Sequence, residues 1–172
     1  DMSQVFDYLE GRIKSSGYDH LWVAPHYLRK ELLRAIRKEA KHARAGEGGS
    51  ILLKLNSLVD DQVIEALYDA SRAGVKVRII VRSICCLVPG VKGTSENIEV
   101  ISIVDKFLEH ARVFSFGNGG KPRMYLASAD LMPRNLDYRV EVAWPVLDEG
   151  LHQEMRDILE LQWQDNTKAR VV

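Results

Sequence analysis

The chain has 172 residues, 46% of them hydrophobic, and its 24 basic residues balance 24 acidic ones. This length is enough for one domain with a core of its own. Zero net charge excludes a global field that attracts polyanions, so any recognition of phosphate must come from a local cluster of charges. No apolar run approaches the roughly 20 residues of a membrane-spanning helix, and no signal peptide is visible.

The N-terminus is expected to precede the main domain. Residues 3–13 are typical of a short helix with Ser3 as its N-cap, and small residues follow it. We therefore expect residues 1–17 to be a lead-in segment from an upstream domain, and residues 18–172 to be one domain. A strand over residues 20–24, ended by a proline, is expected to open that domain.

A long amphipathic helix is predicted next, to about Arg44, because apolar residues recur every four positions at Leu28, Leu32, Ile36 and Ala40. Its other face is basic, with Arg29, Lys30, Arg34, Arg37, Lys38 and Lys41. A polyanion could bind such a stripe. Glu31 and Glu39 are mixed into it, however, and favour an ordinary solvated face.

A strand-helix-strand unit follows, and it predicts parallel pairing of its two strands. The strands are residues 50–55 and 75–81, and the helix between them is capped by Asp60 and ended by Gly74. Arg82 then lies at the carboxyl end of the second strand. Ligands usually bind at this edge of an open α/β sheet, although Arg82 could equally be a surface charge.

The last third of the chain adds strands and a final helix. Short strands are expected over residues 97–103 and 139–146, the latter with Glu141 inside an apolar run, and a loop is expected over residues 131–137. A helix over residues 149–165 is expected to bury Leu151, Met155, Ile158, Leu159 and Gln162 or Trp163. The alternation of strands and amphipathic helices predicts an α/β fold. Cys85 and Cys86 are adjacent, so we expect no disulfide framework but two buried thiols in a reducing compartment.

The most informative segment, residues 107–135, is typical of two strands joined by a glycine-rich turn. His110 and Arg112 lie two residues apart at the start of the first strand, so they are expected to point the same way. An imidazole can attack phosphorus or donate a proton, and a guanidinium can hold phosphate oxygens bidentately. The plain alternative is a half-exposed histidine on an ordinary hairpin.

Other charged side chains near this hairpin are further candidates. Glu109 and Asp130 are acidic neighbours that could orient His110 or Arg112. Three arginines could contact phosphate: Arg123, Arg134 and Arg139. Only Arg134 is expected in a loop that faces the site.

The order of these residues resembles one half of the histidine-lysine-aspartate signature of the phospholipase-D-like fold. In that signature a strand carries His-x-Lys, and the next strand ends near a serine and an asparagine. Here Arg112 stands at the lysine position, Ser128 fits the serine, and Asp130 falls where the asparagine is expected. These departures argue against a standard phospholipase.

The chain is more similar to the final catalytic domain of type 1 polyphosphate kinases, from about Trp22 to Arg170. The similar blocks, all in one order, are residues 53–60 (LKLNSLVD), 80–90 (IVRSICCLVPG), 95–98 (SENI), 107–113 (FLEHARV), 116–120 (FGNGG), 128–137 (SADLMPRNLD) and 138–143 (YRVEVA). Several blocks in one order are far more specific than any single motif.

This resemblance implies an α/β fold with a phospholipase-D-like mixed sheet and helices on both faces. It also implies a reversible transfer of the terminal phosphoryl group of ATP to inorganic polyphosphate, with Mg²⁺. It implies that a histidine on the preceding domain becomes phosphorylated, and that the magnesium ligands also lie upstream, so no metal ligand is assigned here. His110 is the implied catalytic residue, and the implied ATP and phosphate contacts are Arg82, His110, Arg112 and Arg134. The other expected partners are the upstream domains and further copies of the full-length protein; nucleic acid is not expected.

The fragment alone is expected to be inactive, and the expected location is the cytoplasm, with membrane association of the full-length enzyme as an alternative. Two other functions remain open. The chain could be a phospholipase-D-like phosphodiesterase or nuclease that builds its site from two copies. It could also be a non-catalytic module that binds nucleotide or polyphosphate.

Overall fold

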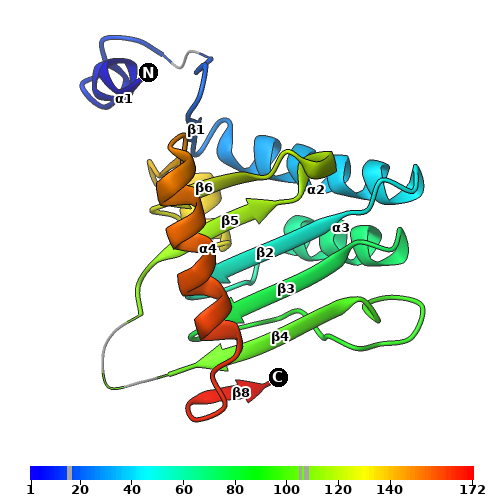
Figure 1. The fold of residues 1–172 in the computed structure, drawn as a ribbon. Coiled ribbons are helices and arrows are strands. Elements are labelled where there is room, and N and C mark those ends of the chain that lie inside the picture. Colours follow the sequence, from blue (N-terminus) through cyan, green and yellow to red (C-terminus); the bar gives the residue numbers. More distant parts are fainter. Residues whose placement is uncertain (15–16, 105, 107–108) are drawn as a thin grey trace.

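A mixed eight-stranded sheet forms the centre of the computed structural model, which describes residues 1–14, 17–104, 106 and 109–172 (Figure 1). The strand order is β1-β7-β6-β5-β2-β3-β4-β8. The strands are β1 (Trp22–Val23), β2 (Ser50–Leu55), β3 (Lys76–Val81), β4 (Ile98–Ile103), β5 (Arg112–Phe116), β6 (Arg123–Ala127), β7 (Val142–Pro145) and β8 (Ala169–Val171). Strands β2, β3 and β4 are parallel, and every other pairing is antiparallel.

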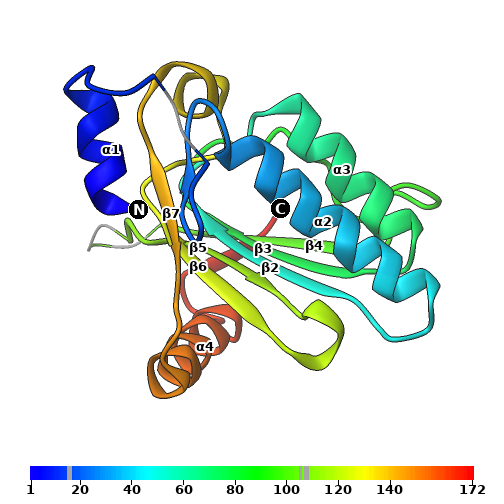
Figure 2. The same cartoon turned by 90° about the horizontal axis from the view of Figure 1, so that it is seen from above.

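Helices cover both faces of the sheet, as the sequence predicts (Figures 1 and 2). The helices are α1 (Met2–Leu9), α2 (Leu28–Arg44), α3 (Asp61–Arg72) and α4 (Glu149–Trp163). Helices α2 and α3 lie side by side on one face, and α4 lies on the other. Neighbouring residues of β3 show the division, because Ile79 packs into the core under α2 and α3 whereas Ile80 packs into the smaller core under α4.

The crossover from β2 through α3 to β3 is confirmed. The Asp60 carboxylate caps α3 by accepting a hydrogen bond from the Val63 backbone N–H at 3.0 Å. Gly74, with φ of +91°, ends the helix in a conformation that favours glycine. Strands β2 and β3 then pair in parallel from Ser50 with Lys76 to Leu55 with Val81, so they end at the same edge of the sheet.

The N-terminal predictions need correction at their ends. Helix α1 begins at Met2 rather than after Ser3, and the Asp1 carboxylate instead accepts hydrogen bonds from the backbone N–H groups of residues 19–21. The strand predicted over residues 20–24 shortens to β1, and a cis peptide bond joins Ala24 to Pro25. Residues 15 and 16, next to the predicted domain boundary, and residues 107 and 108 lie outside the described part of the chain.

The C-terminal third differs more from its predictions. The predicted loop contains a π-helical turn, η2 (Arg134–Tyr138), and the strand predicted from Arg139 begins only at Val142 because Glu141 turns into the protein interior. Helix α4 packs less deeply than predicted: Leu159 is buried, whereas Leu151 and Ile158 are exposed. Strand β8, which was not predicted, pairs with β4.

The two cysteines are also less buried than predicted. Cys86 is exposed and Cys85 is half-buried, so the expectation of two buried thiols is wrong. Burial raises the pKa of the Cys85 thiol.

Among the described residues, no helix is long and apolar enough to span a membrane.

Candidate functional site

The predicted site residues gather at one edge of the sheet. Strands β2, β3 and β6 end at this edge, and β5 and β7 begin there, as the strand directions require. Leu58 ties the loops together, because it forms isolated β-bridges with Cys85, in the loop after β3, and with Leu131, after β6. Segments far apart in sequence therefore meet at the carboxyl ends of the parallel strands, where such sheets usually bind ligands.

An ion pair between Arg112 and Asp130 lies at the centre of this edge. Arg112, at the start of β5, donates from Nη2 to Asp130 Oδ2 at 3.0 Å and from Nε to Oδ1 at 3.3 Å. Their side chains are only 13% and 8% exposed. This two-pronged contact fixes the plane of the guanidinium.

The Asp130 carboxylate also binds the end of β2. It accepts hydrogen bonds from the Asn56 backbone N–H at 2.8 Å, from Asn56 Nδ2 at 3.1 Å and from the Ser57 backbone N–H at 3.2 Å. Burial alone would raise the pKa of Asp130, but the hydrogen bonds from Arg112 and Asn56 outweigh it and hold that pKa below its ordinary value. Asp130 is therefore a permanent anion near neutral pH, and it joins three strands.

His110 contacts the same guanidinium, although it lies just before β5 rather than within it. Arg112 Nη1 and Nη2 lie 3.4 Å and 3.3 Å from His110 Nδ1 and Nε2, and Nη1 donates to the His110 carbonyl oxygen at 3.1 Å. The prediction that the two side chains point the same way is confirmed. The imidazole is exposed to solvent, and a fixed cation lies beside it.

Ser128 and Asn135 surround a second buried carboxylate. The Ser128 hydroxyl and Asn135 Nδ2 both donate to Glu141, the latter at 2.7 Å, and the Val142 backbone N–H donates to Ser128 Oγ at 3.1 Å. Glu141 and Asn135 are 8% and 4% exposed. This network explains why Glu141 interrupts the predicted strand, and it joins the loop after β6 to the start of β7.

Glu109, which was considered a partner for His110 or Arg112, binds Lys54 and Gln162. Lys54 is buried in β2 and its Nζ lies 3.0 Å from Glu109 Oε2, which also accepts from Gln162 Nε2 of α4 at 2.9 Å. The residue before His110 is thus anchored to a central strand and to the helix on the far face.

The structure also places Arg82 and Arg134 at this edge. Arg82 follows β3, next to Ser83, whose backbone N–H donates to the Asn56 carbonyl oxygen at 2.8 Å. Its buried Nε has no hydrogen-bond partner, and within the described residues its guanidinium forms no ion pair. Arg134 begins η2 and is exposed. Neither contacts His110 or Arg112 directly among the described residues.

The other candidates play different parts. The Gly117–Gly120 segment is the turn between β5 and β6, as favoured from sequence. Arg123 follows this turn and lines a groove of about 1170 Å³ away from the site edge.

No group of three or more His, Cys, Asp and Glu side chains in the described ranges could hold a metal ion. Within those ranges the side chains therefore form no metal cage built from protein ligands alone.

Sequence reasoning missed Asn56, Ser57 and Lys54 as parts of the site. Asn56 and Ser57 follow a buried strand directly, which is a usable signal for a residue at the ligand-binding edge. Lys54 interrupts an apolar run and is 4% exposed, so its charge required a partner. That the partner is Glu109 follows from the fold and not from spacing.

Comparison with known proteins places the chain in a family. A family model described as the polyphosphate kinase C-terminal domain 2 matches residues 21–172. Polyphosphate kinase 1 of Chlorobaculum tepidum is 52% identical over 98% of this chain and 24% of its own length, and polyphosphate kinase of Vibrio cholerae is 47% identical over 99% and 24%. The chain thus spans about a quarter of the length of these relatives.

Solved structures agree on the fold. The crystal structure of polyphosphate kinase from Porphyromonas gingivalis superposes with a TM-score of 0.95 at 43% identity, covering 100% of this chain and 26% of that one. Nuc of Salmonella typhimurium, a phospholipase D family member, superposes with a TM-score of 0.62 at 16% identity, over 88% of this chain and 95% of that one. At that identity the likeness shows the fold alone, which is phospholipase-D-like.

Asp130→Asn tests whether the buried ion pair carries stability. The variant keeps the shape but leaves Arg112 unpaired, so we expect a loss of about 3 kcal/mol in the free energy of unfolding at pH 7. The native pKa of Asp130 lies below the unfolded value of about 3.9, so the ion pair stabilises above that pH and its contribution is lost as pH falls through the native pKa.

Urea unfolding at several pH values measures this loss. The difference between wild type and Asp130→Asn should be largest above about pH 5 and should shrink in acid. Asp157→Asn, on the exposed side of α4, is the control and should stay within about 0.5 kcal/mol of wild type. A difference that is independent of pH would contradict the ion-pair assignment.

Proposed function

The chain belongs to the polyphosphate kinase family, as its C-terminal domain 2, and from that premise we propose that it supplies half of a composite active site. The reaction transfers the terminal phosphoryl group of ATP reversibly to inorganic polyphosphate. The observation that carries the proposal is the Arg112 guanidinium, held by Asp130 and in contact with both ring nitrogens of His110.

His110 is the catalytic residue of this half. Its exposed imidazole can contact a phosphate oxygen and can give or take a proton at the attacking or leaving oxygen. Arg112 fixes its orientation through the ring and the backbone carbonyl. Because Asp130 neutralises Arg112, this ion pair adds no net positive charge to the site. Its contribution is to hold the His110 side chain in a fixed orientation.

Arg82 supplies the net positive charge. Its guanidinium lacks a carboxylate partner among the described residues and has one N–H that makes no hydrogen bond. A phosphate oxygen would satisfy that donor and compensate the charge. Arg134, exposed at the start of η2, is the second phosphate contact, and together they resemble the cationic clamps that stabilise charge in phosphoryl transfer.

The remaining parts of the site lie upstream of this chain in the complete enzyme. We assign the phosphorylated histidine and the magnesium ligands to the preceding domain, across an interface with His110. When bound, Mg²⁺ would neutralise charge on the phosphate groups. Residues 1–17 serve as the lead-in from that domain and residues 18–172 form the catalytic unit, and the complete enzyme associates with further copies of itself.

His110→Ala tests the catalytic role in the complete enzyme. Loss of an acid-base group typically costs about a hundredfold in rate, and we expect at least that loss in polyphosphate synthesis. Folding should be unchanged, since the exposed imidazole packs against few core atoms. His152→Ala, a half-buried histidine on α4, is the matched control. Near-normal synthesis by a folded His110→Ala enzyme would rule out the role.

Arg82→Lys and Arg82→Ala test the phosphate contact in the complete enzyme. Lysine keeps the charge but loses the planar fork of donors, so ATP affinity should fall from Arg to Lys and again from Lys to Ala. Titration with ATP measures the order. Equal affinity for all three proteins would mean that Arg82 is a surface charge without contact to the nucleotide.

A further inference from the structure

Helix α2 presents an unusually uniform face to solvent. Six of its residues are exposed and all six are Lys or Arg; we call them the cationic face: Lys30, Arg34, Arg37, Lys38, Lys41 and Arg44. Five of them follow at steps of four, three, four and three residues, which places them on one line along the helix. In a chain with zero net charge, this is a local concentration of positive charge.

One of the two acidic residues that seemed to dilute this face does not lie on it. Glu39 is 1% exposed and points inward, where its carboxylate accepts from the backbone N–H of Ser50 at 3.1 Å and of Asn118 at 2.7 Å. Glu31 remains near the surface, and Arg34 lies 3.6 Å from it. The sequence argument for an ordinary mixed face therefore fails for Glu39.

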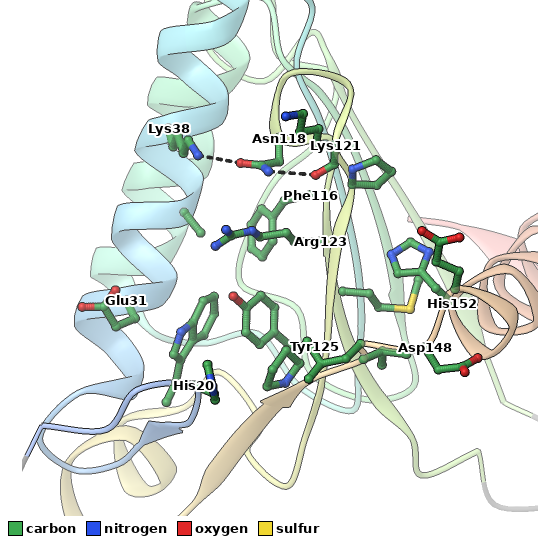
Figure 3. Close-up of a pocket in the computed structure, with 18 of the residues that line it drawn as sticks. His20, Glu31, Lys38, Phe116, Asn118, Lys121, Arg123, Tyr125, Asp148 and His152 are labelled. Carbon is green, nitrogen blue, oxygen red and sulfur yellow. Dashed lines mark hydrogen bonds between the residues drawn. The ribbon is translucent and has the colours of Figure 1, made fainter. Parts of the chain in front are cut away.

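The turn between β5 and β6 extends the cationic face sideways. Lys38 Nζ donates to Asn118 Oδ1 at 2.7 Å, which holds the lysine toward the turn (Figure 3). Lys121 and Arg123 line the same groove as Arg34 and Lys38, and Figure 3 shows Arg123 reaching from β6 toward α2. Asp148 and Glu149, at the start of α4, also line this groove, and Figure 3 shows Asp148 across β6 from Lys38.

The cationic face starts beside the candidate site and leads away from it. At the start of α2, Arg29 forms ion pairs with Asp60 and with Asp137, and the latter belongs to η2 at the site edge. The helix ends near the first residue of β2, at the opposite edge of the sheet. From Lys30 to Arg44 the line is about 21 Å long at 1.5 Å per residue.

We propose that the cationic face of α2, with Lys121 and Arg123, binds inorganic polyphosphate as the chain extends away from the active site. This inference rests on the proposed function. A line of separate cations suits a linear polyanion that can follow the helix, and each contact replaces counterions that the polyanion would otherwise hold. Binding here would keep a long product on the enzyme between transfers.

The neighbouring helix favours a linear polyanion over a flat membrane. Helix α3 lies beside α2 on the same face of the sheet, and its exposed charged residues are Asp61, Glu65, Asp69 and Arg72, which leaves it acidic although Arg72 pairs with Glu65 and Asp69. An anionic bilayer pressed against both helices would meet these carboxylates and be repelled. A single chain can lie along α2 and the turn without approaching α3.

Removing two charges from the middle of the line tests the proposal. Arg37→Gln with Lys41→Gln leaves the candidate site and the groove untouched, and Lys92→Gln with Arg170→Gln removes two exposed charges elsewhere as the control. Binding of long-chain polyphosphate, tripolyphosphate and ATP is measured on this chain over a salt series. Vesicles rich in phosphatidylserine serve as the membrane probe.

We expect the α2 variant to bind long-chain polyphosphate roughly tenfold more weakly at about 50 mM salt, with a salt slope shallower by one to two units. Its affinity for ATP and tripolyphosphate, and the affinities of the control variant, should be unchanged. In the complete enzyme the α2 variant should start synthesis at the normal rate but release shorter products.

Unchanged affinity for long-chain polyphosphate in the α2 variant would overturn the inference, as would an equal loss in the control variant. Vesicle binding that depends on Arg37 and Lys41, without such dependence for polyphosphate, would overturn it in favour of a membrane surface. An active complete enzyme with normal product length in the α2 variant would refute only this inference, whereas absence of any synthesis by the wild-type enzyme would refute the proposed function.

Discussion

The ion pair between Arg112 and Asp130 is the contact on which the site depends. It joins the start of β5 to the end of β6, and through the Asn56 and Ser57 N–H groups it reaches the end of β2. Removing the two charges of a buried ion pair from water is costly. The pair is stabilising only where its geometry is good and further hydrogen bonds satisfy both groups. Here those bonds fix three strand ends at once, and His110 takes its position from the same guanidinium.

The ion pair also sets the electrostatics of the site. Because the charge of Arg112 is compensated by Asp130, we propose Arg82 and Arg134 as the cations that bind a phosphate ligand. The buried carboxylate of Glu141 is likewise occupied by Ser128 and Asn135. The polar residues that resemble the phospholipase-D-like signature therefore have two different roles. Ser128 holds the sheet edge together through its hydrogen bond to Glu141, whereas His110 faces solvent.

Local patterns predicted the parts of the fold whose cause is local. Helix α2 follows from its apolar period, and the β2-α3-β3 unit follows from the Asp60 cap and the Gly74 stop. The patterns failed where contacts with distant residues determine the structure. Strand β7 starts late because Glu141 points inward and accepts a hydrogen bond from Asn135. Helix α4 packs on the sheet through Leu159, and Arg78 of β3 lies 5.1 Å from the centre of the Trp163 ring.

The same division applies to the candidate site. The contact between His110 and Arg112 spans two residues and could be expected from the motif, although the strand starts only at Arg112. The contact between Asn56 and Asp130 spans 74 residues, and no spacing rule reaches that far. Glu39 was expected on the solvent face of α2, because the helical pattern indicates the direction of a side chain only approximately. Its carboxylate instead points inward and accepts hydrogen bonds from Ser50 and from Asn118 in the turn between β5 and β6.

The central claim is that this chain carries one half of a composite site. The most direct measurement is incubation of the purified chain with γ-labelled ATP and Mg²⁺, followed by assay for labelled protein and for polyphosphate. We expect neither stable labelling nor product, because we assign the phosphorylated histidine and the magnesium ligands to the preceding domain. Stable labelling of His110, or polyphosphate made by the chain alone, would contradict it and would make this chain a self-sufficient enzyme.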